Sequence, residues 1–323
     1  MSSLKILLTG ASGFVGGAVL RQLLARPDMR VCVIGRSKLT GLLPELEQFV
    51  GQELFSETNC LRALNSVNVV IHCAARVHVM QEQAADPYSE FRRVNVEGTL
   101  QLARQAAAAG VRRFIFISSI KVNGEDTSQG IPFCPNGVMG PQDAYGISKC
   151  EAEQGLQALA AETGMEVVII RPVLVYGPGV KANFLSMMSW LSRGIPLPFG
   201  AIHNKRSLVA LDNLVDLIVT CIDHPAAANQ VFLVSDGEDL STTDLLRRMA
   251  SALGKPARLL PVPAWLLEFG ARLLGKQDLA QRLCGSLQVD ISKTRELLGW
   301  TPPVSVDEGL RKTAEYFLEH RSK

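Results

Sequence analysis

The residues best suited to chemistry in this sequence are a tyrosine and a lysine one helical turn apart. Tyr145 and Lys149 lie in the stretch DAYGISKCEAEQG, at the head of a predicted helix. Residues four apart share one face of a helix, so the phenol and the ammonium are predicted neighbours. A free phenol has a pKa of about 10, and a nearby ammonium lowers it. The spacing therefore predicts that Lys149 lowers the pKa of Tyr145 toward the range useful for acid–base catalysis. A contact between two side chains on a helix surface would give the same spacing, so the pair needs support from elsewhere in the chain.

Short apolar runs alternate with helical stretches before and around this pair. The predicted strands are 4–10, 30–36, 67–75, 112–119 and 165–177. The predicted helices are 14–26, 58–65, 89–109 and 144–163. Uninterrupted apolar strands that alternate with helices indicate a parallel sheet buried on both faces. We therefore expect an α/β fold, a doubly wound parallel sheet that holds its ligands at the carboxyl ends of the strands.

The regular alternation fades after residue 176. A strand, a helix and a strand at 206–210, 212–223 and 230–236 are predicted to return to the first domain. We expect residues 1–176 with 205–236 to form a dinucleotide-binding Rossmann domain. Residues 177–204 and 237–323 are expected to form a smaller, mostly helical substrate lobe. Its apolar stretch 265–275 is expected to pack within the lobe, although contact with a membrane would suit the same residues.

A glycine-rich turn follows the first predicted strand and opens the first predicted helix. In TGASGFVGGAVL, Gly10 permits a tight turn, Gly13 lets the backbone approach a pyrophosphate, and Gly16 allows close packing of helix on strand. Free amides at the helix start would hold the anion. This pattern predicts dinucleotide binding, and a purely structural turn is the alternative.

Composition excludes several functional classes. A net charge of +2 in 323 residues does not suggest a nucleic-acid surface. The seven cysteines contain no CxxC pair and are expected to be free thiols in a reducing cytosol. The histidines show no metal-ligand spacing, so no metal site is predicted. No apolar span of 18 residues occurs, and we expect no membrane span and a cytoplasmic protein.

Six motifs in order along the chain resemble the NAD-dependent epimerase/dehydratase family of extended short-chain dehydrogenases/reductases. They are TGASGFVG, HCAA (72–75), RVNVEGT (93–99), FISSIKVNGE (116–125), YGISK (145–149) and RPVLVYGPG (171–179). The resemblance implies that Tyr145 exchanges a proton with a sugar oxygen. It also implies that Lys149 holds the nicotinamide ribose and that Ser119, rather than Ser118, hydrogen-bonds the same sugar oxygen.

The resemblance further implies two sets of binding residues. Those expected at the cofactor are Gly10, Ser12, Gly13, Phe14, Val15, Gly16, Arg36, Ala74, Ala75, Asn95, Tyr145, Lys149, Pro172 and Val173. Those expected at a UDP-sugar substrate are Ser119, Tyr145, Asn183 and Arg206. A structural role for Asn95, and a solvated position for Arg206, are the alternatives.

Three positions depart from the family pattern. Gly35–Arg36 stands where NAD enzymes place an acidic ribose ligand, GQELF (51–55) replaces an adenine-contacting motif, and Leu174 replaces an asparagine common in epimerases. Because Arg36, Ser37 and Lys38 offer positive charge and a hydroxyl to a 2′-phosphate, we expect NADP(H) or NAD(H), with NADP(H) favoured.

The motifs look most like the branch that reduces a UDP-4-keto-6-deoxy-N-acetylhexosamine to UDP-N-acetylquinovosamine for surface polysaccharide. Our first hypothesis is therefore an NAD(P)-dependent oxidoreductase that acts at C4 of a UDP-hexose. A UDP-hexose 4-epimerase with the same residues is the alternative, and a non-catalytic dinucleotide-binding regulator is the third. Alanine-rich faces in 98–110 and 152–164 predict a homodimer, as is common in such enzymes, unless these faces pack within one chain.

Overall fold

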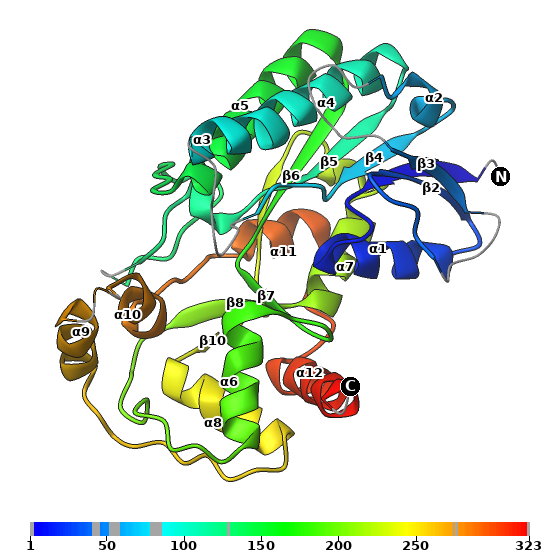
Figure 1. Ribbon diagram of the computed structural model, residues 1–323. Coiled ribbons are helices and arrows are strands. Elements are labelled where there is room, and N and C mark those ends of the chain that lie inside the picture. Colours follow the sequence, from blue (N-terminus) through cyan, green and yellow to red (C-terminus); the bar gives the residue numbers. More distant parts are fainter. Residues whose placement is uncertain are drawn as a thin grey trace.

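The computed structural model of the chain describes residues 3–40, 46–51, 59–77, 86–127, 130–273, 275 and 277–321. Residues 52–55 of the GQELF stretch lie outside these ranges. A seven-stranded parallel sheet with the order β3-β2-β1-β4-β5-β6-β9 forms the larger part (Figure 1). Its strands are β1 (Leu4–Thr9), β2 (Met29–Gly35), β3 (Glu47–Val50), β4 (Val69–His72), β5 (Arg113–Ile117), β6 (Glu166–Pro172) and β9 (Val231–Val234). The strand order changes direction between β1 and β4, which confirms the doubly wound α/β fold.

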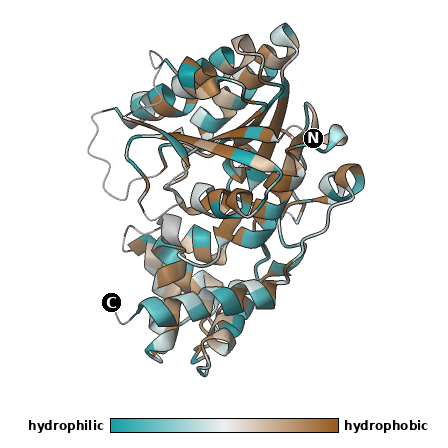
Figure 2. Cartoon of the chain, turned by 90° about the vertical axis from the view of Figure 1, so that its right-hand side faces the viewer, coloured by the Kyte–Doolittle hydropathy of each residue, from teal (hydrophilic) through white to brown (hydrophobic). Residues whose placement is uncertain are grey.

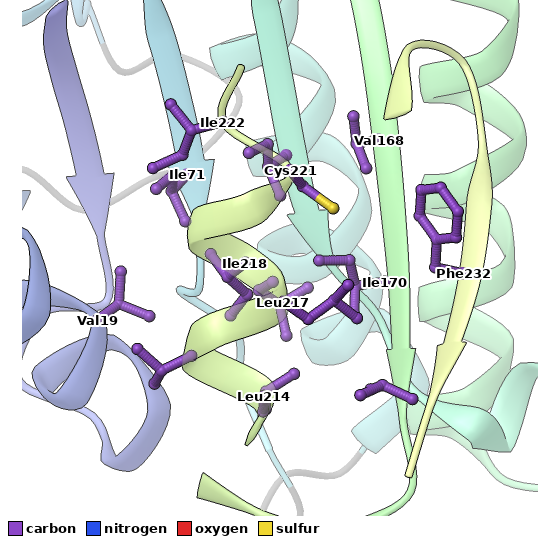
Figure 3. Packing of buried hydrophobic residues seen from close by; sticks show 14 of the residues in the cluster. Val19, Ile71, Val168, Ile170, Leu214, Leu217, Ile218, Cys221, Ile222 and Phe232 are labelled. Carbon is purple, nitrogen blue, oxygen red and sulfur yellow. The ribbon is translucent and has the colours of Figure 1, made fainter. Parts of the chain in front are cut away.

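Helices cover both faces of this sheet, which explains why its strands are almost wholly apolar. One face carries α1 (Phe14–Leu24) and α7 (Leu211–Thr220), and the other carries α2 (Leu61–Leu64), α4 (Thr99–Ala108) and α5 (Ala144–Thr163). Figure 3 shows Leu214, Leu217 and Ile218 of α7 against side chains of β4 and β6. Coloured by hydropathy, the strands form an apolar layer between helices of mixed character (Figure 2). All five residues of β5 are buried, as expected for a strand with no solvent-facing side.

Helix α5 is defined by signals at both of its ends. The Asp143 side chain accepts a hydrogen bond of 2.7 Å from the Gly146 amide and so caps the first turn. Gly164 ends the helix in the left-handed region, with φ at 76°. These signals place Tyr145 in the first turn and Lys149 in the second.

A second sheet has three strands in the order β10-β8-β7. They are β7 (Leu174–Tyr176), β8 (Arg206–Ala210) and β10 (Asp239–Leu240). The single strand predicted over 165–177 is therefore wrong, because the chain leaves the large sheet after Pro172, which has no amide hydrogen for the ladder. Of the strands predicted to return to the first domain, β8 pairs with β7, whereas β9 pairs with β6 of the large sheet.

The remaining elements complete the lobe and the connections. The lobe helices are α6 (Ala182–Ser192), α8 (Thr242–Ala252), α9 (Ala264–Leu273), α10 (Gln277–Cys284) and α12 (Val306–His320). Helix α11 (Ser292–Leu298) packs near β9, and short turns of helix form α3 (Pro87–Phe91), η1 (Arg92–Gly98), η2 (Ile120–Val122) and η3 (Pro225–Ala227). The lobe has its own buried cluster, in which the rings of Tyr176 and Phe184 stack with centroids 5.4 Å apart. The division of the chain into two domains at the predicted residues stays a prediction.

An extended segment, 286–290, lies between β8 of the second sheet and the loop after β5. On one side, the Phe133 amide donates to the Gln288 carbonyl at 2.9 Å, in the loop after β5. On the other side, the Ser207 amide of β8 donates to the Leu287 carbonyl at 2.8 Å. We call this segment the connecting strap.

Candidate active site

Four neighbouring strands of the large sheet end at the same edge, and each is followed by predicted site residues. Gly10 follows β1, Ala74 and Ala75 follow β4, and Ser119 follows β5. Pro172 ends β6, with Val173 next to it. Because all these strands are parallel, their carboxyl ends meet along one line, where α/β folds bind ligands.

The glycine turn has the geometry of an anion-binding cradle. Gly10 adopts a φ of 71°, and a Cβ on it would lie only 2.6 Å from the Ala74 amide nitrogen. A Cβ on Gly16 would lie 2.2 Å from the Gly10 carbonyl oxygen, so the helix could not approach the turn with any larger residue. Gly13 caps α1 without a side-chain hydrogen bond, and Ser12 beside it is exposed. The amides of Phe14 and Val15 open the helix above this turn, so the residues present fit the pyrophosphate of a dinucleotide.

Lys149 is buried below this edge and is directed at β5. Its side chain is 2% exposed, and Nζ donates a 2.8 Å hydrogen bond to the Ile117 carbonyl. Nζ also lies 4.3 Å from the ring centroid of Phe116. Burial lowers the pKa of Lys149 to about 8, so the ammonium form still predominates at neutral pH.

Tyr145 lies on the same helix, partly exposed, with its ring edge-on to Phe91 at 6.1 Å between centroids. Burial, and then the Asp143 carboxylate, raise the pKa of the phenol above its usual value. The prediction that Lys149 lowers this pKa is therefore wrong for the protein alone. The physical reason is the direction of the lysine, whose ammonium is held by Ile117 and Phe116 toward the sheet.

The two serines after β5 have different surroundings. Ser118 is buried and donates a short hydrogen bond to Glu153, which forms an ion pair with Arg171. Ser119 is partly exposed, and its Oγ accepts only a 3.2 Å bond from the Lys121 amide among the described contacts. Ser119 can therefore still donate its hydroxyl proton, which supports the choice of Ser119 over Ser118.

Asn95 is 1% exposed and clamps the segment after β4. Its Oδ1 accepts from the Arg76 amide at 2.8 Å, while Nδ2 donates to the Arg76 carbonyl and to Ser148 Oγ, both at 3.0 Å. Ser148 in turn donates to the Tyr145 carbonyl at 2.8 Å. These contacts give Asn95 a structural role, which holds the Ala74–Ala75 segment against the first turns of α5.

A buried polar network beneath the glycine turn is absent from the sequence predictions. Thr9 Oγ1 accepts from the Ala74 amide at 3.1 Å and lies 2.8 Å from His72 Nδ1, while His72 Nε2 lies 3.0 Å from Thr99 Oγ1. Burial, and then the Lys149 charge, lower the pKa of His72 to about 3, so the ring is neutral. In the neutral ring one nitrogen donates and the other accepts, so one of the two threonine hydroxyls donates its proton to His72. Thr9 and His72, polar residues at the ends of two apolar strands, were the available signal for this network, whereas Thr99 begins α4.

The cations predicted for the adenosine end of the cofactor are exposed. Arg36, Ser37 and Lys38 follow Gly35, the last residue of β2, beside β1. A Cβ on Gly35 would meet no atom within 4 Å. These side chains are therefore accessible to a phosphate group at this end of the sheet.

The other two predicted substrate residues lie on α6 and β8, and no hydrogen bond within the described ranges joins either to the sheet edge. Asn183 is exposed in the first turn of α6. Arg206 is partly buried at the start of β8, where Nη1 donates to the Gly285 carbonyl at 3.0 Å, so its solvated alternative is wrong. Burial, and then Arg282, lower the pKa of Arg206. Two neighbouring guanidinium groups favour an anionic ligand.

Across the described ranges, no three His, Cys, Asp or Glu side chains form a possible metal site, and no helix is long and apolar enough to cross a membrane. All seven cysteines are free thiols.

Comparison with known proteins gives a consistent result. The NAD dependent epimerase/dehydratase family matches residues 6–235. The UDP-glucose 4-epimerase of Vibrio cholerae is 54% identical over 323 residues, 99% of this chain and 97% of that protein. The N-acetyl-alpha-D-glucosaminyl-diphospho-ditrans,octacis-undecaprenol 4-epimerase of Escherichia coli O157:H7 is 27% identical. The match covers 99% of this chain and 97% of that protein. The solved structure of UDP-glucuronic acid 4-epimerase from Bacillus cereus with NAD has a TM-score of 0.80 at 22% identity, covering 99% of both chains.

Proposed function

Because the chain belongs to the NAD-dependent epimerase/dehydratase family and is an enzyme, we propose that it is a UDP-hexose 4-epimerase. The observation that carries this proposal is the 54% identity, over nearly the full length of both chains, to a UDP-glucose 4-epimerase. This identity favours the epimerase, which was our alternative, over our first hypothesis, the 4-keto-6-deoxy-hexosamine reductase. Membership of an enzyme family also sets aside the non-catalytic regulator.

The residues at the sheet edge have separate tasks in this proposal. Tyr145 exchanges a proton with the oxygen at C4 of the hexose, and the Ser119 hydroxyl donates to that same oxygen and holds it in place. NAD, when bound in its oxidised form, supplies a hydride acceptor and a positive charge, and a positive charge near a phenol lowers its pKa. Lys149 keeps α5 in position through its hydrogen bond to the Ile117 carbonyl.

Other residues would bind and orient the ligands. The α1 amides and the turn from Gly10 to Gly16 would hold the pyrophosphate, with Ala74, Ala75, Pro172 and Val173 along the remaining strand ends. Asn183 and Arg206 would bind the UDP part of the substrate, because a guanidinium fork matches phosphate oxygens. Asn95 would act only through the segment that it clamps.

The test of the epimerase is a direct assay on the purified enzyme. We expect interconversion of UDP-glucose or UDP-N-acetylglucosamine with the corresponding galacto-sugar, without net consumption of added NADH or NADPH. Stoichiometric loss of NADPH absorbance on addition of a UDP-4-keto-6-deoxy-N-acetylhexosamine, with no interconversion of the two sugars, would instead establish the reductase.

Exposed cations after β2 favour the reductase as second candidate, since a reductase takes up fresh reduced cofactor, commonly NADPH, in each turnover. We expect Arg36→Ala to weaken NADPH binding by about tenfold to a hundredfold and NADH binding much less, because a charge-assisted contact contributes roughly 1.5–3 kcal/mol. Fluorescence titration of both cofactors measures this, with Arg30→Ala on β2 as a matched exposed-arginine control. If Arg36→Ala weakened the binding of NADPH and NADH equally, Arg36 would not contact the 2′-phosphate.

The quaternary structure and the location are further parts of the proposal. Within one chain, α4 and α5 pack together so closely that a Cβ on Gly155 would lie 2.7 Å from Leu100. This contact uses part of the alanine-rich faces, and the remainder is proposed to form a homodimer, which sedimentation velocity at micromolar concentration would test. The cytoplasm is the proposed location, in keeping with seven free thiols.

A further inference from the structure

Helix α9 exposes large apolar side chains to solvent. None of its residues is buried, and Trp265, Phe269 and Leu273 are 67%, 57% and 73% exposed. These three recur every four residues and so follow one face of the helix. Figure 1 shows α9 beside α10 at the margin of the lobe, away from the seven-stranded sheet. The expectation that the whole stretch 265–275 packs within the lobe is therefore wrong for these side chains.

The apolar area continues beyond the helix. Segments 195–201 and 258–263 lie side by side, since the Leu260 amide donates to the Leu197 carbonyl at 2.8 Å and the Leu197 amide to the Arg258 carbonyl at 2.9 Å. The second of these segments leads directly into α9. We define the α9 surface as the exposed residues Ile195, Leu260, Trp265, Leu266, Phe269 and Leu273. Large exposed apolar patches on soluble proteins often mark sites of interaction.

The chain segments around the α9 surface are strongly basic. Residues 181–206 contain four Lys and Arg residues and no acidic residue. Residues 255–282 contain five Lys and Arg residues and two acidic residues. Together they carry a net charge of +7, whereas the whole chain carries +2, so the rest of the protein is acidic. Among the described residues, the exposed cations on these segments are Lys181, Arg193, Lys205, Lys255, Arg258, Arg272 and Arg282.

We propose that the α9 surface binds the anionic face of a lipid bilayer. Tryptophan, phenylalanine and leucine on one side of a short helix, with cations beside them, are the composition of an interfacial helix, and ten residues are too few to span a bilayer. A second copy of the chain fits less well, because a two-fold contact would bring the same basic segments against each other. The proposal does not depend on which sugar the enzyme converts or in which direction.

Flotation of the purified enzyme with lipid vesicles tests the proposal. We expect at least about tenfold more protein on vesicles of equal phosphatidylglycerol and phosphatidylcholine than on phosphatidylcholine alone, since several cations near an anionic surface each add to the attraction. Trp265→Ser with Phe269→Ser should remove this binding, and Arg258→Glu with Arg272→Glu should remove the preference for anionic lipid. Val138→Ser, at a side chain that is 90% exposed elsewhere, is the control and should bind as wild type. All variants should retain the enzyme's turnover of a soluble UDP-sugar.

Three results would overturn the proposal. They are absence of wild-type protein from anionic vesicles, equal loss of binding in the Val138→Ser control, and unchanged binding in the Trp265→Ser, Phe269→Ser variant. A change in sedimentation of that double variant from dimer to monomer, without vesicle binding by the wild type, would assign the α9 surface to a second copy of the chain.

Discussion

Replacing Tyr145 with phenylalanine is expected to lower turnover by at least about two orders of magnitude, with cofactor binding unchanged. The substitution keeps the ring against Phe91 and removes only the hydroxyl that would exchange a proton with the substrate. General acid–base catalysis contributes about a hundredfold to ten-thousandfold to a rate, so the effect should appear in kcat. Steady-state kinetics and cofactor titration of the same preparation measure the two quantities.

Tyr316→Phe is the matched control for this substitution. Tyr316 lies on α12, partly exposed and stacked on His320, and its hydroxyl has no part in the candidate site. It should leave turnover unchanged. Near-normal turnover in Tyr145→Phe would remove Tyr145 from the catalytic residues.

The second large effect concerns stability rather than catalysis. Glu153 and Arg171 form an ion pair at 2.5 Å, with side chains 1% and 3% exposed, and Arg171 also donates to Asn123 Oδ1 at 2.9 Å. Glu153→Ala would leave a buried guanidinium without its carboxylate, which typically costs about 3–5 kcal/mol. We expect the free energy of unfolding, from urea denaturation, to fall by about that amount.

Glu308→Ala provides the comparison, because Glu308 also pairs with an arginine, Arg311, but on the surface of α12. Its effect on the free energy of unfolding should be much smaller, since solvent screens exposed pairs. Similar losses in both variants would contradict the view that the buried pair fixes α5 against the end of β6.

Local patterns in the sequence were sufficient to predict six strands of the large sheet and the cofactor and catalytic residues that follow them, whereas β3 was not predicted. Apolar runs and the glycine turn depend on neighbouring residues, so they can be recognised along the chain. The direction of the Lys149 side chain could not be predicted, because one-turn spacing places Tyr145 and Lys149 on one face but does not orient a flexible four-carbon chain.

The second sheet was missed for a different reason. An apolar run indicates a strand, but the partner of β8 is set by tertiary contacts with β7 and the connecting strap, which its own residues do not encode. The exposure of α9 could not be predicted either. Apolar residues recur at the same spacing in helices that pack on a core and in helices whose apolar face meets solvent. The buried Thr9, His72 and Thr99 network depends on three segments far apart in the chain.

The connecting strap has a consequence for how the protein unfolds. Its backbone is hydrogen-bonded to the loop after β5 on one side and to β8 on the other, so the strap keeps only part of its hydrogen bonds when either neighbour unfolds. A segment shared in this way couples the loop after β5 to the second sheet, and we expect the two to melt in one cooperative event. The chain is therefore a poor candidate for exchange of its lobe with that of a relative, because such a graft has to carry residues 286–290 together with both of their partners.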